Sequence, residues 1–212
     1  MERILAILIG YALGTFQTGY FMGKIFGIDI REHGSKNAGM TNVNRTLGSV
    51  PAAFVFVIDI LKAVAAFVIA SIIFDGGSPL GGDLFFISNY VTPGLWAGIG
   101  AVLGHNFPFF MRFKGGKGIS CTLGVLLMVN WQGAVIAYVI GFFAVLIFRY
   151  ISLASLLITF FAPILFFIFE NDIEVVVLTA LLGALAWFMH RDNIKRLITK
   201  TERKFAFGKK TI

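Results

Sequence analysis

Three polar, basic segments, the first two of them rich in glycine, contain the side chains that could do chemistry. They lie at 31–48, 104–118 and 190–202, and each holds one of the three histidines together with Lys or Arg. Glycines expose backbone N–H groups, hydroxyls add donors, and a guanidinium matches the shape of a phosphate. The three segments therefore predict the binding of anionic, phosphate-bearing molecules.

The second segment ends in a glycine-rich turn that leads into a predicted helix. Its last residues are Lys114-Gly115-Gly116-Lys117-Gly118. Free N–H groups and the dipole at such a helix start favour negative charge. The turn is not a Walker A loop, because Ile119 stands where that loop needs Ser or Thr. The alternative interpretation is a set of juxtamembrane cations that touch anionic lipid.

The first and third segments also have two interpretations each. The first could be a polar loop among lipid headgroups, although such a loop needs no run of Asn, Ser and Gly. In the third, His190 and Asn193 are three residues apart and share a face of a helix. A positively charged stop after the last span would explain the cations of this segment, but not its His and Asn.

Several catalytic arrangements are absent from the sequence. The residues five positions after the three histidines are Ala38, Phe110 and Lys195, so no His-x4-Asp pair could supply a base. Neither a His-x-x-Glu-His motif nor paired cysteines support a metal site. Cys121 lies in an apolar run without a nearby base, which argues against a thioester intermediate. We therefore expect no metal and no cofactor.

The composition is that of a membrane protein. Hydrophobic residues make up 58% and charged residues 14%, and the mean hydropathy is +0.86. Soluble domains average about 45–50% hydrophobic residues and about 25% charged residues. These values exclude disorder, a soluble body with a nucleic-acid-binding tail and a secreted disulfide scaffold. Charge-poor runs predict membrane helices at 4–23, 50–74, 90–103, 119–148, 151–169 and 175–189, the first of them a retained helix rather than a signal peptide.

Charge placement predicts the orientation of these helices. Lys and Arg mark the cytoplasmic side, and they gather in the three polar segments, whereas 75–89 and 170–174 carry only acidic charges. Placing all three segments in the cytoplasm requires two short helices within 119–148, separated at Asn130-Trp131-Gln132. We expect an all-α polytopic membrane protein, a single domain over 1–212, with about seven transmembrane helices, the N-terminus outside and the C-terminus cytoplasmic.

Two charged residues lie inside the second predicted span. Asp59 and Lys62 are three residues apart and share a helix face. Charges within a membrane tend to pair or to face the bundle interior. One interpretation is a structural ion pair that fixes packing, and the other is a wall of the substrate site.

The three segments resemble the motifs of one enzyme family. Residues 34–45 are similar to the G-S-G-N-x-G-x-T-N-x-x-R motif of the acyl-phosphate-dependent glycerol-3-phosphate acyltransferases of bacteria, the PlsY family. Residues 104–118 match its second motif, G-H-x-(F/Y)-P followed by F-K-G-G-K-G. Residues 190–202 resemble its third, H-R-x-N-I-x-R-L ending in Glu. Lys36 and Lys200 depart from the pattern, because the family usually has Gly at both positions.

The resemblance implies a reaction in the bacterial inner (cytoplasmic) membrane, at a site that faces the cytoplasm. A fatty acyl group passes from acyl phosphate to the 1-position of sn-glycerol 3-phosphate. The products are 1-acyl-glycerol 3-phosphate (lysophosphatidic acid) and phosphate, in an early step of phospholipid synthesis. An upstream enzyme that forms acyl phosphate is an implied partner.

The resemblance also implies a set of site residues. Catalytic roles are expected for Ser35, Arg45, Lys117 and His190, and substrate binding for Gly34, Asn37, Thr41, Asn42, Gly104, His105, Lys114, Gly115, Gly116, Gly118, Asn193 and Glu202. Ser35, Arg45 and Lys117 would hold phosphate, helped by backbone N–H groups at Gly115, Gly116 and Gly118. His190 and Asn193 would orient glycerol phosphate, and Glu202 is expected to be structural rather than catalytic.

Two other functions stay open on the sequence alone. A membrane transporter or binding protein for small phosphorylated metabolites could use the same anion sites, although no duplicated motif supports it. A headgroup transferase that handles phosphoanhydrides would need acidic clusters for Mg²⁺. The predicted cytoplasmic segments contain few carboxylates, which argues against that third interpretation.

Overall fold

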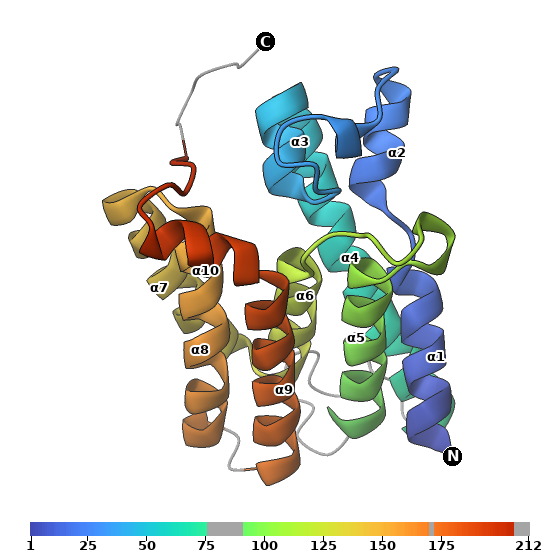
Figure 1. Ribbon diagram of the computed structural model, residues 1–212. Helices are drawn as coiled ribbons and strands as arrows, with labels where there is room; N and C mark the ends of the chain where they lie inside the picture. The colour runs from blue at the N-terminus through green and yellow to red at the C-terminus, as the bar shows by residue number, and fades with distance from the viewer. Residues whose placement is uncertain (76–90, 170–171, 206–212) are drawn as a thin grey trace. The chain divides into compact units, whose positions relative to one another are not determined.

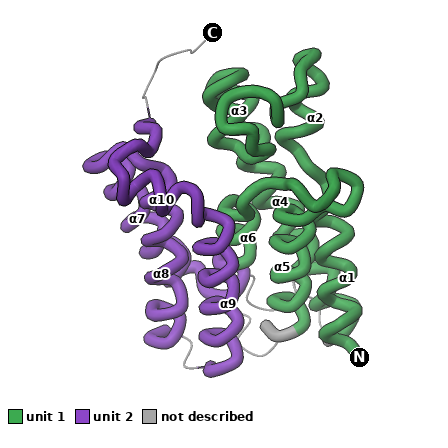
Figure 2. The backbone as a smooth tube through the Cα atoms, in the orientation of Figure 1, with its two compact units in different colours: residues 1–125, 209–212 green, residues 126–208 purple. Residues whose placement is uncertain are grey.

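Helices form nearly all the regular structure of the protein. The computed structural model describes residues 1–75, 91–169 and 172–205 (Figure 1). No strand occurs among these residues, so the predicted all-α class is confirmed. The chain divides into two compact units, Met1–Val125 and Leu126–Gly208 (Figure 2). The single domain expected over 1–212 stays a prediction.

Unit 1 contains the first two polar segments and the helices that support them. Its long helix is α4 (Ser49–Asp75), and α5 (Val91–Asn106) packs against both α4 and α1. The other elements of the unit are α1 (Glu2–Gly14), α2 (Thr18–Ile25), the 3-10 helix η1 (Ile30–Glu32), α3 (Met40–Leu47), the 3-10 helix η2 (Phe109–Met111) and the start of α6 (Ile119–Val129).

Glycines allow α1 and α5 to approach each other closely. Gly10 and Gly14 of α1 face the backbone of α5, and Gly100 and Gly104 of α5 face the backbone of α1. A Cβ at any of the four would overlap the opposite helix, which is the close packing that small residues permit in membranes. Gly104, which we expected to bind substrate, therefore has a packing role within α5.

The first span differs from its prediction. The charge-poor run 4–23 predicted one helix, but α1 ends at Gly14 and α2 begins at Thr18. Nothing in residues 15–17 forbids a helix. Asp59 and Lys62 of α4 bond to the chain at this break. The two helices together still form one membrane-length stretch, Glu2–Ile25.

Unit 2 contains the end of α6 and four further helices. These are α7 (Trp131–Phe148), α8 (Ile151–Phe169), α9 (Ile173–Met189) and α10 (Arg191–Ile198). Asn130 caps the N-terminus of α7, because its Oδ1 accepts a hydrogen bond from the Gly133 N–H at 2.7 Å. The predicted separation of 119–148 into two helices is therefore confirmed.

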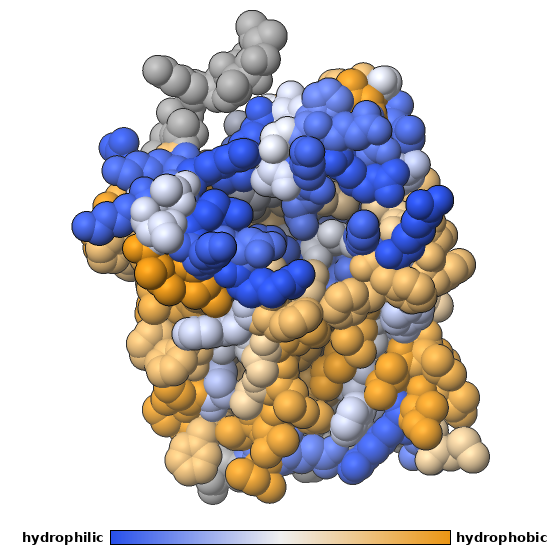
Figure 3. Space-filling model, in the orientation of Figure 1, coloured by the Kyte–Doolittle hydropathy of each residue, from blue (hydrophilic) through white to orange (hydrophobic). Residues whose placement is uncertain are grey.

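The helix surfaces are suited to lipid. On α7, for example, Phe142, Phe143 and Ile147 are more than half exposed. Hydrophobic residues cover the bodies of α8 and α9 in unit 2, while hydrophilic residues gather over α10 (Figure 3). In unit 1, hydrophilic residues gather in the same way around α2 and α3 (Figure 3).

Among the residues that the structure describes, four stretches are long and apolar enough to cross a membrane: Glu2–Ile25, Ser49–Phe74, Trp131–Phe148 and Ile151–Phe169. The bent pair α9 and α10 would make a fifth, and α6 is shorter. These helices support an integral membrane protein, while the number of seven spans and the orientation stay predictions. The acidic residues Asp83 and Glu170, which belong to the acidic ranges of the charge argument, lie outside the described residues.

Candidate active site

Asn42 organises the first polar segment. This residue of α3 is 1% exposed, and its side-chain amide bonds to three backbone groups. Its Oδ1 accepts the N–H of Ser35 at 2.6 Å, and its Nδ2 donates to the carbonyls of Ile30 and His33, each at 3.0 Å. Asn42 therefore fixes the turn from which Ser35 is exposed to solvent.

Two lysines adopt a left-handed backbone conformation. The φ angles are 60° at Lys36 and 57° at Lys200, next to 58° at Gly34. This conformation costs an ordinary residue about 1–2 kcal/mol, and glycine avoids that cost. Lys36 and Lys200 are the two positions at which the sequence departs from the glycines of the motifs. Both substitutions therefore add a charge while they strain the backbone.

Arg31 bonds the start of the first segment to residues that precede it. Its Nε and Nη2 donate to the two carboxylate oxygens of Asp29 at 3.0 and 2.7 Å, and its guanidinium lies 4.8 Å from the centre of the Tyr20 ring. The hydrogen bond from Arg31 lowers the pKa of Asp29 to about 2. Arg31 is therefore committed to Asp29, and the assignment of Arg45 to phosphate stays a prediction.

The first segment continues into α3 and meets the second segment. Thr41 and Arg45 are four residues apart on α3, share one face, and are both half-buried. Asn37 accepts the N–H of Gly39 at 2.9 Å and donates through Nδ2 to the Gly115 carbonyl at 3.4 Å. Unit 1 thus brings together two of the three predicted segments.

The glycine turn of the second segment is bonded to the end of α5. The N–H of Gly115 donates to the Asn106 carbonyl at 3.1 Å, and the N–H of Gly116 donates to the His105 carbonyl at 3.0 Å. The prediction that these two N–H groups bind phosphate is therefore wrong, because they already satisfy the last carbonyls of a helix. The side chain of Lys114 is exposed, that of Lys117 is half-buried, and Gly118 has a φ of 79°.

Asp59 and Lys62 of α4 form the predicted ion pair. Lys62 Nζ lies 2.8 Å from Asp59 Oδ1, and the two side chains are 7% and 1% exposed. The same ammonium lies 2.9 Å from Nδ1 of His105, while Thr18 donates to Asp59 Oδ1 at 2.9 Å. The ion pair is therefore confirmed, while its alternative role as a wall of the substrate site stays a prediction.

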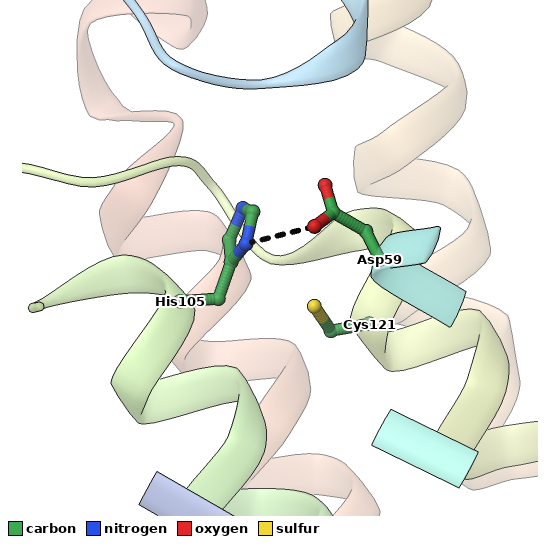
Figure 4. Close-up of side chains that lie close together, drawn as sticks. All are labelled: Asp59, His105 and Cys121. Atoms are coloured by element: carbon green, nitrogen blue, oxygen red, sulfur yellow. Dashed lines mark ion pairs between the residues drawn. The ribbon is translucent and has the colours of Figure 1, made fainter. Parts of the chain in front are cut away.

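Cys121 completes a group of three potential metal ligands. The ligand atoms of Asp59, His105 and Cys121 lie within 4.8 Å of one another (Figure 4). The distance between Asp59 Oδ1 and His105 Nδ1 is 3.7 Å. The ammonium of Lys62 contacts both of these atoms, so a side chain already supplies the positive charge between them.

The third segment lies in unit 2 and is built around Glu202. One oxygen of this carboxylate accepts from Asn193 Nδ2 at 2.7 Å and from Ser152 Oγ at 3.0 Å, and the other accepts from Arg196 Nε at 2.7 Å. Burial raises the pKa of Glu202, but the hydrogen bonds from Arg196, Asn193 and Ser152 outweigh it, so the pKa lies below its ordinary value. These bonds give Glu202 a structural role, in which it holds Asn193.

His190 stands at the joint between α9 and α10, where the chain bends by 63°. It is buried, and its Nδ1 lies 2.7 Å from the carbonyl of Ala186. Since that nitrogen faces a carbonyl, it carries the proton, and Nε2 is left to face other groups. His190 and Asn193 are both buried on the same side of α10, as the three-residue spacing predicted.

Sequence reasoning missed several polar residues. Ser152 has no motif around it, and only the fold brings it to Glu202. Gln17 and Asn106 are fully buried. Gln17 donates a hydrogen bond to the His105 carbonyl at 3.0 Å. Asn106 lies against Gly118, where an added Cβ would be 2.7 Å from Asn106 Oδ1. The position of Gln17 inside the apolar run 4–23 could have indicated a buried polar contact.

Membrane-length helices and two joined polar segments rich in cations indicate an integral membrane protein with polar segments suited to anionic groups. Comparison with known proteins identifies the family. The family described as glycerol-3-phosphate acyltransferase matches residues 4–200. Among the similar proteins, the glycerol-3-phosphate acyltransferase of Alkaliphilus metalliredigens is 39% identical over 212 residues, covering 100% of this chain and 99% of the relative. That of Aquifex aeolicus is 34% identical and covers 97% of this chain and 100% of the relative.

Solved structures lead to the same family. The crystal structure of PlsY, an integral membrane glycerol 3-phosphate acyltransferase, in its glycerol 3-phosphate form has a TM-score of 0.84 and 32% identity, covering 97% of this chain and 96% of that one. Its lysophosphatidic acid form has a TM-score of 0.82 and 31% identity, with the same coverage. The chain therefore belongs to the glycerol-3-phosphate acyltransferase family, and it is a membrane-embedded acyltransferase.

Proposed function

We propose that the protein transfers a fatty acyl group from acyl phosphate to the 1-position of sn-glycerol 3-phosphate. The products are 1-acyl-glycerol 3-phosphate and inorganic phosphate. The main support is that the two similar PlsY structures are named for glycerol 3-phosphate and lysophosphatidic acid, which are the acceptor and the acylated product of such a reaction. Acyl transfer to glycerol 3-phosphate is a step of phospholipid synthesis.

The cations of unit 1 suit two phosphate-bearing substrates. Ser35 is exposed on a turn held by Asn42, Arg45 shares a face of α3 with Thr41, and Lys114 and Lys117 flank the glycine turn. We assign Ser35, Arg45 and Lys117 to substrate phosphate, with Lys114 nearby. In unit 2, His190 and Asn193 are assigned to the glycerol phosphate. Positioning and charge stabilisation are the main requirements of this reaction, because phosphate is a good leaving group.

The sequence has no His-x4-Asp pair that could supply a protein base. Nδ1 of His33 lies 2.9 Å from the Asp29 carbonyl, and Nδ1 of His190 lies 2.7 Å from the Ala186 carbonyl, so neither ring is oriented by a carboxylate at that nitrogen. Nδ1 of His105 faces an ammonium. We infer that an oxygen of the substrate phosphate takes the proton from the attacking hydroxyl. A bond then forms between that hydroxyl oxygen and the acyl carbon, and the bond from the acyl carbon to the phosphate oxygen breaks.

The proposed setting is the bacterial cytoplasmic membrane, with the polar segments facing the cytoplasm. The acyl chain would lie among the apolar helices and enter from the bilayer. The one-sided distribution of Lys and Arg supports this orientation. An enzyme that forms acyl phosphate would supply the donor.

The test uses the purified full-length protein in detergent with acyl phosphate, glycerol 3-phosphate and a metal chelator. We expect phosphate release that depends on glycerol 3-phosphate and is matched by lysophosphatidic acid. No release, together with uptake of glycerol 3-phosphate into proteoliposomes, would instead support a transporter. Release that stops when the chelator is present would contradict the metal-independent reaction.

A further inference from the structure

The Asp59–Lys62 pair bonds to both helix ends at the break in the first span. Lys62 Nζ donates to the Phe16 carbonyl at 2.6 Å, just after the end of α1. Thr18, the first residue of α2, donates its hydroxyl to Asp59 at 2.9 Å. A helix carries partial negative charge at its C-terminus and partial positive charge at its N-terminus. The cation and the carboxylate therefore each lie at the helix end of opposite charge, and together they stabilise the break.

Lys62 also connects the ion pair to the second segment. An ammonium has no lone pair, so across the 2.9 Å contact Lys62 donates and Nδ1 of His105 accepts. The imidazole is then neutral, with its proton on Nε2. Nε2 lies so close to Gly116 that a Cβ there would overlap it, and the His105 carbonyl accepts the Gly116 N–H at 3.0 Å. One residue thus joins the ion pair to the turn that carries Lys117.

The helix α2 connects the break to the first segment. Gly19 packs against the Ala38 carbonyl so closely that a Cβ would overlap it. Met22 of α2 belongs to one buried apolar cluster with Ile30 and Val43. The direction in which α2 leaves the break therefore sets the position of the residues that follow it, up to the start of α3.

We propose that Asp59 and Lys62 are positioning residues, which hold the first segment through α2 and the second through His105. The hydrogen bond that joins the two segments directly, from Asn37 to the Gly115 carbonyl, is long at 3.4 Å. Met111 of the second segment also packs in the buried cluster with Ala38 and Val43 of the first. The common support from α4 adds to these direct contacts. This inference rests on the proposed assignment of both segments to substrate phosphate.

The main test replaces both charges by apolar side chains of similar size, Asp59→Leu together with Lys62→Met. Removing one charge alone would leave the other buried and unpaired, whereas removing both avoids that penalty. We expect the full-length double variant to fold with a lower melting temperature, because Thr18, the Phe16 carbonyl and His105 Nδ1 lose their hydrogen-bond partners. Its kcat should fall about 100-fold, because small displacements of reacting groups have effects of that size. KM should change much less, since the phosphate ligands remain.

Hydrogen–deuterium exchange supplies a readout that needs no catalysis. Amides at 31–39 and at 115–118 should exchange faster in the double variant, and both segments should respond together. Unchanged kcat and unchanged exchange in a folded double variant would overturn the proposal. If exchange rises as expected but the unchanged protein shows no phosphate release dependent on glycerol 3-phosphate, the proposed function fails and the positioning role stands.

A milder variant decides the question if the double variant does not fold. Thr18→Val removes only the hydroxyl that bonds to Asp59, and kcat should fall about 3- to 10-fold, the size expected for one lost hydrogen bond. The matched control is Thr159→Val in unit 2, where a buried hydroxyl donates to carbonyls of its own helix. Equal kcat in Thr18→Val, Thr159→Val and the unchanged protein would contradict the positioning role.

Discussion

Asn42 offers the most quantitative test of how the first segment is built. Its amide makes three hydrogen bonds, at 2.6, 3.0 and 3.0 Å, in a side chain that is 1% exposed. Each such bond contributes about 0.5–1.5 kcal/mol, so Asn42→Ala should lower the free energy of unfolding by about 1.5–4.5 kcal/mol. In a chain of this length, a loss of 1 kcal/mol in the free energy of unfolding lowers the melting temperature by about 2–4 °C. A central loss of about 3 kcal/mol predicts a melting temperature about 6–12 °C lower.

The assay is thermal unfolding of the purified protein in detergent, followed by kinetics at a temperature where both proteins are folded. Asn44→Ala is the matched control, because Asn44 lies on the same helix but is only half-buried. Its melting temperature should change by about 2 °C or less. The Asn42 variant should also lose kcat, since the turn that presents Ser35 is released. Equal melting temperatures in the two variants, or unchanged kcat in Asn42→Ala, would refute this account of the segment.

Three further predictions follow from the same geometry. Lys36→Gly and Lys200→Gly each remove a lysine in the left-handed conformation. After the greater chain entropy of glycine is subtracted, the free energy of unfolding should rise by about 0.5–1 kcal/mol. A lower melting temperature in these variants would contradict the strain argument. The pKa of Glu202 is lowered in the folded protein, so its stabilising effect is present at neutral pH and is lost as the pH falls through that lowered value. The free energies of unfolding of Glu202→Gln and the unchanged protein, measured against pH, should therefore converge in acid. A difference that stays constant with pH would contradict the role of the Glu202 carboxylate. Arg45→Ala and Lys117→Ala should each raise KM for a phosphate-bearing substrate, and unchanged steady-state kinetics in both would remove the phosphate assignment.

The features that could be predicted from sequence are those that depend on residues close together in the chain. Apolar runs predicted the helices, the polar triplet at 130–132 predicted the separation of α6 and α7, and a three-residue spacing predicted the Asp59–Lys62 pair. Charge placement predicted that all three polar segments lie on the same side of the membrane, and the hydrogen bond from Asn37 to Gly115 joins the first two.

The features that could not be predicted depend on contacts between distant residues. The break before Thr18 is stabilised by side chains more than 40 residues away, so the run 4–23 alone reads as one helix. A glycine turn before a helix suggests free N–H groups, but those of Gly115 and Gly116 are taken by carbonyls of α5. Gly104 belongs to a motif, yet its size is explained by packing against α1.

The central claim is that acyl phosphate is the donor and that its phosphate is the leaving group. Acyl phosphate labelled with ¹⁸O at the oxygen between carbon and phosphorus tests this directly, with the purified protein and unlabelled glycerol 3-phosphate. The account predicts that all the label appears in inorganic phosphate and none in the lysophosphatidic acid, with release dependent on the acceptor. Label in the acyl product, or phosphate release at the same rate without glycerol 3-phosphate, would contradict it.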